Sequence, residues 1–97
     1  MAEHLTIVAR IEAEPAHVDF VRAELVKLIA PTLAEDGCVQ YDLHQDNDEP
    51  AVFLFYENWT TRELWQDHMN SPHLAAFGAA VDGRVKSIVI NEMARVQ

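Results

Sequence analysis

The segment from Val52 to Trp59 constrains the fold most strongly, because it is apolar on both faces that a β-strand would present. Aromatic and β-branched side chains of this kind suit a pleated, buried surface. The two alternating sets are Phe53, Phe55 and Trp59 on one side, and Val52, Leu54 and Tyr56 on the other. A sheet with one solvated face alternates apolar with polar residues. This segment therefore predicts a strand whose two faces are both covered.

The other segments give the order strand, helix, strand, strand, helix, strand. The expected strands are residues 5–13, 38–45, 51–59 and 85–96, and the turn residues 46–50 join the middle two as a hairpin. This order is typical of an α+β, ferredoxin-like βαββαβ fold, with an antiparallel sheet and helices on one of its faces. A length of 97 residues predicts one domain, residues 1–97.

Local signals place the helices between these strands. Pro15 opens the first helix, whose apolar stripe is Val18, Val21, Leu25, Leu28, Ile29 and Leu33. We expect Pro31 to kink the last turn of this helix, because it lacks a backbone donor. Thr60 and Glu63 form the pattern of a capping box. A second helix start follows, with Ser71 as N-cap and Pro72 at the first helical position.

The last expected strand is apolar on both sides as well. Its two sets are Val85, Val89 and Met93 against Ile88, Ile90 and Ala94. The helices of one chain can cover only one face of the sheet, and exposed apolar patches beyond a few hundred Å² are rare on monomers. The sequence therefore predicts that the second face packs on a copy of itself in a two-fold homodimer.

Composition excludes several partners. The net charge is -9, and the seven Lys and Arg residues are scattered, which disfavours nucleic acid and anionic membrane surfaces. No apolar run approaches membrane-spanning length, and the first residues do not resemble a secretory signal. The single Cys38 excludes an intramolecular disulfide and is expected to be a small buried hydrophobe. A cytoplasmic location is expected.

Cofactor motifs are scarce. The three glycines form neither a dinucleotide fingerprint nor a P-loop. His68 and His73 are five residues apart with a helix break between them, so we expect their side chains to diverge and predict no metal site. No cofactor is expected, although either histidine remains available as an axial haem ligand.

Three residues are candidates for chemistry: two at the end of the strand 51–59 and one in the short helix that follows it. His68 is interpreted as a general base, because its ordinary pKa lies near neutrality; the alternative is a partly buried histidine in a pocket wall. Trp59 offers a flat wall for an aromatic substrate, or is plain core. Glu57 lies in an apolar strand, so it either pairs with Arg10 or Arg84 or polarises a substrate hydroxyl.

The spacing of these residues resembles one known family, the antibiotic biosynthesis monooxygenases, and among them the small quinol-monooxygenase-like proteins. The motifs are Tyr56-Glu57-x-Trp59, His68, Ser71-Pro72-His73-x-x-x-Phe77, Gly37-Cys38-x-x-Tyr41 and the turn Asp46 to Pro50. The resemblance implies a dimeric α/β barrel and oxygenation of a small quinol or polyhydroxy-aromatic by O₂ without flavin, haem or metal. His68, Trp59 and Glu57 would be catalytic. Substrate binding is assigned to Tyr41, Phe55, His73 and Phe77.

Other functions remain open at this point. An isomerase of a small hydroxy-carbonyl signal molecule could use the same histidines, although a polar pocket would suit it better than Trp59. A non-catalytic dimer of a stress response would bind small aromatics without consuming oxygen. Haem degradation is a third alternative. The substrate and the use of O₂ are not fixed by these residues.

Overall fold

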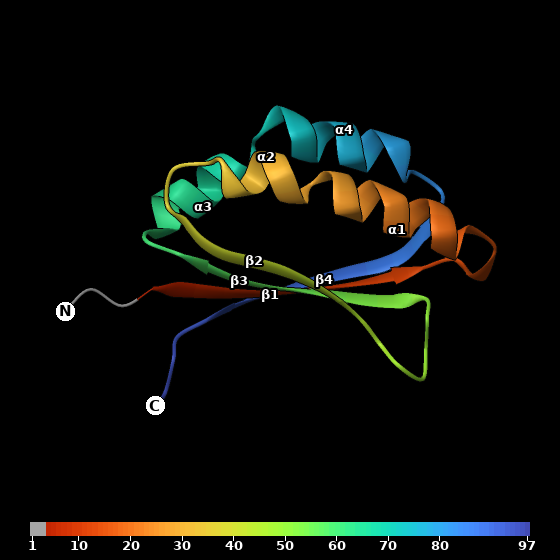
Figure 1. Ribbon diagram of the computed structural model, residues 1–97, viewed down its shortest axis with the longest axis horizontal. Helices are drawn as coiled ribbons and strands as arrows, with labels where there is room; N and C mark the ends of the chain where they lie inside the picture. Colours follow the sequence, from red (N-terminus) through yellow and green to blue (C-terminus); the bar gives the residue numbers. More distant parts are fainter. Residues whose placement is uncertain (1–3) are drawn as a thin grey trace.

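The computed structural model describes residues 4–97 and contains one antiparallel sheet with every helix on the same face (Figure 1). The elements are β1 (Leu5–Ala13), a 3₁₀ turn (Pro15–His17), α1 (Val18–Lys27), α2 (Ile29–Leu33), β2 (Cys38–Gln45), β3 (Val52–Trp59), α3 (Arg62–Met69), α4 (Pro72–Ala80) and β4 (Val85–Met93). The strand order is β2-β3-β1-β4. This arrangement confirms the predicted α+β, ferredoxin-like fold.

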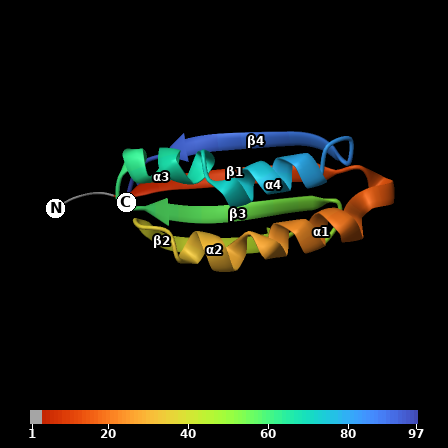
Figure 2. The same ribbon diagram turned by 90° about the horizontal axis from the view of Figure 1, so that it is seen from above.

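The helices form a layer above the sheet and leave its other face open. Seen from above, α1 and α2 lie over the β2 side, while α3 and α4 lie over the middle and the β4 side (Figure 2). Alternate residues of β1 and β3 point toward this layer, and the register places Ala9 beside Phe55 and Ile11 beside Phe53. Each of these four side chains is at most 8% exposed. The core therefore lies between the sheet and the helices.

Pro31 divides the first helical region, as its chemistry predicts. The ring of a helical proline clashes with the carbonyl four residues earlier, and α1 ends at that residue, Lys27. A short second helix, α2, then carries the chain to Gly37, whose φ of 84° suits glycine. A Cβ on Gly37 would lie 2.5 Å from Leu64 Cδ1. This close approach brings the end of α2 against α3.

Three local predictions were wrong. The N-cap of α3 is Thr61 rather than Thr60, and its hydroxyl accepts a hydrogen bond from Leu64 N at 3.1 Å. Leu33, expected in the apolar stripe, is 52% exposed at the last residue of α2, where the neighbouring Thr32 takes the buried position. A register shift between Glu12 and Ala13 puts Val85 opposite Ala13, on the helix-covered face, so it does not share a face with Val89.

The open face, which is the sheet face turned away from the helices, mixes apolar and polar side chains. Its apolar residues include Tyr56, Val89 and Met93, between 38% and 48% exposed. A chain of side-chain hydrogen bonds also crosses it, from Thr6 to Asn58 to Gln40 to Asp42, at 2.6, 2.8 and 2.7 Å. The prediction that both faces are purely apolar is therefore only partly correct. The homodimer stays a prediction.

Within residues 4–97, every helix is too short to cross a lipid bilayer.

Candidate active site

Glu57 and Trp59, two residues apart on β3, point to the helix-covered face and form the floor of the candidate site. Trp59 is fully buried, Glu57 is 3% exposed, and Trp59 Nε1 donates a hydrogen bond to Glu57 Oε1 at 3.0 Å. Burial raises the pKa of Glu57 to about 7, and Glu35 adds to this effect, whereas the Trp59 hydrogen bond opposes it. Glu57 therefore takes up and releases a proton near neutral pH.

The expected ion pair between Glu57 and Arg10 or Arg84 does not form. Arg10 lies on the open face, where its guanidinium is 3.7 Å from Glu12. Arg84 donates to the carbonyl of Ala80 and lies over the Phe20 ring. In the described part of the chain, Glu57 has only the indole of Trp59 as a hydrogen-bond partner. A buried carboxylate without a cation favours its neutral form.

His68 lies against this floor, from the last turn of α3. Its side chain is 2% exposed, and its ring centroid is 4.8 Å from that of Trp59 and 5.5 Å from that of Tyr41, the latter edge-on. Burial lowers the pKa of His68, while a hydrogen bond and the charge of Glu35 raise it. The net shift is downward, so a neutral imidazole, the form that can act as a base, is favoured at pH 7.

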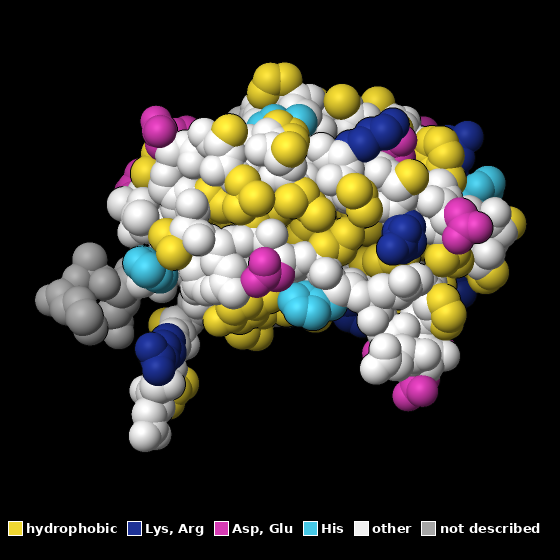
Figure 3. Space-filling model, in the orientation of Figure 1, with side chains coloured by type: hydrophobic (Ala, Val, Ile, Leu, Met, Phe, Trp, Pro, Cys, Tyr) yellow, Lys and Arg dark blue, Asp and Glu magenta, His cyan; other side chains and the backbone are white. Residues whose placement is uncertain are grey.

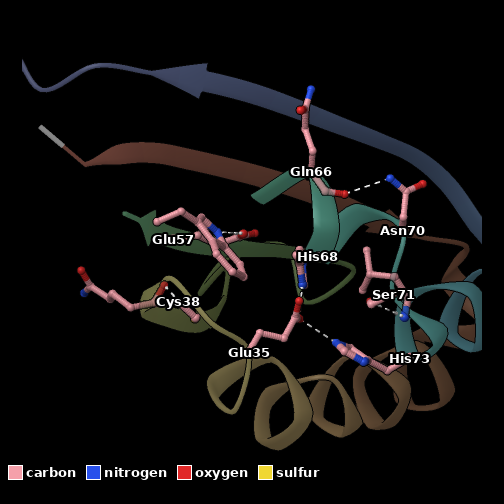
Figure 4. Close-up of polar contacts among 11 residues, drawn as sticks. Glu35, Cys38, Glu57, Gln66, His68, Asn70, Ser71 and His73 are labelled. Atoms are coloured by element: carbon pink, nitrogen blue, oxygen red, sulfur yellow. Dashed lines mark hydrogen bonds and ion pairs between the residues drawn. The ribbon is translucent and has the colours of Figure 1, made fainter. Parts of the chain in front are cut away.

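Glu35 links the two histidines and was missed in the sequence. It lies between α2 and β2, and its Oε2 is 2.7 Å from His68 Nδ1 and 2.8 Å from His73 Nε2 (Figure 4). The signal in the sequence was limited to its position in the short connection before Gly37, between α2 and β2, which it shares with its neighbour. Nothing in the sequence distinguished Glu35 from the neighbouring Asp36, which is exposed.

The prediction that His68 and His73 diverge was wrong. Ser71 caps α4 and Pro72 begins it, so the chain changes direction between the two histidines and brings both imidazoles to Glu35. The helix break at Ser71 and Pro72, which predicted that the two side chains diverge, is the feature that turns both of them toward Glu35.

The donor atoms of Glu35, His68 and His73 lie within 4.8 Å of one another, so this set is where a divalent metal would be considered. Ligands 2.0–2.1 Å from a tetrahedral zinc are about 3.3 Å apart. The two N–O distances here are 2.7 and 2.8 Å, which are hydrogen-bond lengths. The arrangement fits a hydrogen-bonded cluster, and a metal would require it to widen.

Aromatic side chains complete the site on the β2 side. Tyr41 stacks on Phe55 with ring centroids 4.2 Å apart, and burial raises the pKa of its phenol far above the usual range. Phe77 packs, half-buried, against the apolar cluster that contains these two residues. Cys38 is not activated, since burial and the nearby carboxylates raise its pKa to about 11.

Two buried polar groups lack a hydrogen-bond partner in the described chain: Thr32 Oγ1, beside the Tyr41 phenol, and Trp65 Nε1 on α3. Each such group costs about 1–3 kcal/mol when left unsatisfied. A ligand oxygen or a water would satisfy them.

Viewed from the β2 side, apolar side chains gather between the helices and the sheet (Figure 3).

Sequence comparison relates this chain to a known protein family. The family model for antibiotic biosynthesis monooxygenases matches residues 4–80. The chain belongs to this family. Rv0793 of Mycobacterium tuberculosis, which carries a provisional monooxygenase name, is 36% identical over 81 residues that cover 84% of this chain and 79% of that protein. "Probable quinol monooxygenase YgiN" of Escherichia coli K12 is 28% identical over 91 residues, covering 84% and 88%.

Solved structures agree with this family assignment. The crystal structure of PA3566 from Pseudomonas aeruginosa superimposes with a TM-score of 0.95 at 34% identity and covers 100% of this chain and 98% of that one. The structure of Rv0793 gives a TM-score of 0.89 at 28% identity, covering 97% and 96%. The chain is thus a monooxygenase-family protein, and an oxidoreductase activity is the class that these relatives support.

Proposed function

We propose that the protein is a cofactor-independent monooxygenase that uses O₂ to oxidise a small quinol or polyhydroxy-aromatic compound. The observation that carries this proposal is the buried His68, which is held by Glu35 against Trp59, whose indole in turn holds Glu57. An electron-rich aromatic needs only deprotonation, alignment and exclusion of water to react with O₂. The name of YgiN supports the quinol class.

The reaction would begin with transfer of a substrate hydroxyl proton to His68. The resulting anion passes one electron to O₂, and the two radicals combine to form a C–O bond. The peroxide anion takes the proton back from His68, and the O–O bond then breaks with loss of the C–H proton at the same carbon, so that water leaves and one oxygen atom stays on the product as a carbonyl. Glu57, with its pKa raised to about 7, supplies a carboxylic acid that can donate a hydrogen bond to a substrate oxygen.

The structure modifies the role given to Trp59. A fully buried ring has no free face on which a substrate could stack, so its contribution is support. Its Nε1–H holds Glu57, and its ring packs beside His68. Tyr41 and Phe55 are 4% and 2% exposed and stack on each other, so the same argument applies to them: they are proposed to back the substrate site from within the core. His73 and Phe77, which are partly exposed, keep their proposed places beside the substrate.

Oxygen consumption tests this function directly. Protein treated with EDTA, then freed of it, is expected to consume O₂ with at least one member of a hydroquinone panel, because the proposed reaction uses the protein's own side chains and no metal ion. Small hydroxy-dicarbonyl compounds serve as the second arm. Their isomerisation without oxygen uptake would favour an isomerase, and binding of hydroquinones without turnover would favour a ligand-binding protein. Activity that appears only after metal or haem is restored would contradict the proposal.

We also propose that the open face joins two copies in a homodimer. Exposed apolar side chains on this face support it, and Val89 is 48% exposed there. Val89→Lys is expected to shift the protein toward monomers in analytical ultracentrifugation at micromolar concentration, because it places a charge beside Arg10 at the interface.

Ile88→Lys is the matched control for the dimer. Ile88 is also 48% exposed on β4, but the register pairs it with Ile11, on the helix-covered face. This variant is expected to sediment as wild type. A wild-type protein that sediments as a monomer, or equal effects of the two substitutions, would contradict an interface on the open face.

A further inference from the structure

One carboxylate oxygen, Glu35 Oε2, joins the two histidines of the site. Glu35 Oε2 contacts a nitrogen of His68 from α3 and a nitrogen of His73 from α4. Exposure rises along this chain of contacts, from 2% for the His68 side chain to 18% for Glu35 and 21% for His73. The carboxylate therefore lies between the buried imidazole of His68 and the more exposed imidazole of His73 (Figure 4).

The contact determines which nitrogen of His68 carries the proton. An ionised carboxylate only accepts hydrogen bonds, so the imidazole nitrogen that faces it donates. His68 then has its hydrogen on Nδ1, and Nε2 holds the free lone pair. The second nitrogen of a histidine is commonly fixed by this kind of partner. Without Glu35, nothing in the described chain would hold this tautomer, because His68 has no other side-chain hydrogen bond.

We propose that Glu35 is the positioning residue of the site, which holds His68 in the Nδ1–H tautomer and stabilises the imidazolium formed when Nε2 takes the substrate proton. This inference rests on the proposed function. The logic is that of a carboxylate–histidine pair in which the carboxylate orients the base and does not itself take the proton. Glu35 Oε2 lies 2.7 Å from Nδ1, which is close enough for a charge-assisted hydrogen bond to stabilise the imidazolium of the buried His68.

His73 fixes Glu35 in turn. An acidic side chain that is 18% exposed would otherwise be free to turn toward water. The Nε2 of His73 donates the second hydrogen bond to the same oxygen and holds it toward α3. This contact depends on the start of α4 at Pro72, since His73 is the next residue. His73 therefore acts on the base through Glu35.

The groups that face His68 come from four elements or loops. They are Glu35 before β2, Tyr41 on β2, Trp59 on β3 and His73 on α4. Of the effects on the pKa of His68, burial is the largest and lowers it, while Glu35 raises it and His73 lowers it. Removal of the Glu35 charge should therefore lower the pKa of His68 further.

Glu35→Gln tests the inference in catalysis, because it keeps the side-chain shape and removes the charge. The kcat for a hydroquinone is expected to fall by roughly 10²-fold or more, as for an unsupported catalytic imidazole. The acid limb of the kcat/KM profile is expected to move to lower pH, with little change in KM. A purely structural role would lower stability and leave the acid limb in place, which would overturn the proposal. Asp36→Asn, which removes the adjacent exposed carboxylate, should leave both readouts unchanged.

Nitrogen NMR of ¹⁵N-histidine-labelled protein tests the same inference without substrate. His68 is expected to be the Nδ1–H tautomer in wild type and to lose this preference in Glu35→Gln, with its signals assigned through His68→Gln. An Nε2–H tautomer in the wild-type protein would overturn the positioning role, whatever the reaction is. If the tautomer is as expected but no hydroquinone is consumed, the role of Glu35 stands and the proposed reaction fails.

Discussion

A His68→Ala variant is expected to lose about 10²–10⁴-fold in kcat for the best hydroquinone substrate, the usual contribution of a general base. Among the histidines within residues 4–97, His68 alone is both almost fully buried and in contact with Glu35, Trp59 and Tyr41. Alanine leaves no group at this place that can take the substrate proton. The measurement is the initial rate of oxygen uptake at saturating substrate.

The matched control for this variant is His17→Ala. His17 lies in the 3₁₀ turn before α1, at the opposite end of the helix layer from α3 (Figure 2). Its removal is expected to leave turnover unchanged, and circular dichroism should show both variants folded. A folded His68→Ala protein that retains wild-type turnover would remove the base assignment while leaving the family and the fold intact.

The pH dependence of turnover also tests the assignment of His68 as the general base. Because burial lowers the pKa of His68 below its ordinary value of 6.5, the neutral imidazole persists into mildly acidic solution. Turnover is therefore expected to fall only as the pH drops below about 6.5, when His68 becomes protonated in the free enzyme.

The fold was predictable because each element carries its own local signal. The aromatic and β-branched run in residues 52–59, the turn after Gln45 and the cap at Ser71 depend on neighbours in sequence, and the structure has all three. The N-cap at Thr61 was missed by one residue, because two threonines stand side by side and only the path of the chain chooses between them. Here Thr60 N is bonded to the carbonyl of Gly37.

The site was less predictable because its central contact is long-range. Glu35 is 33 residues from His68, and no periodicity relates them. His68 and His73 were singled out by type and context, but their common partner depends on the break at Pro72 and on the approach of Gly37 to α3. The sequence indicated which single residues could take part in chemistry. Only the three-dimensional fold shows that Glu35, His68 and His73 lie together.

Glu57→Gln is expected to stabilise the protein at alkaline pH and to abolish part of its pH dependence of unfolding. The pKa of Glu57 is about 7 in the folded state and 4.5 ordinarily. Between these values the folded protein holds a proton that the unfolded chain releases, so the free energy of unfolding falls as pH rises through this window. The full loss is on the order of 3 kcal/mol at pH 8. Glutamine stays neutral and can still accept the Trp59 hydrogen bond.

Urea denaturation of both proteins at pH 5 and pH 8 measures this effect. The variant should be nearly as stable as wild type at pH 5 and more stable at pH 8, while Glu49→Gln in the exposed hairpin should show no such difference. Comparing proteins at the same pH cancels the opposite contribution of His68, whose lowered pKa destabilises the fold in acid. An identical stability difference at both pH values would mean that Glu57 is not titrating in the folded state. A buried carboxylate that lowers the stability of the fold is expected where activity needs it. The stabilised Glu57→Gln variant should therefore also turn over substrate more slowly.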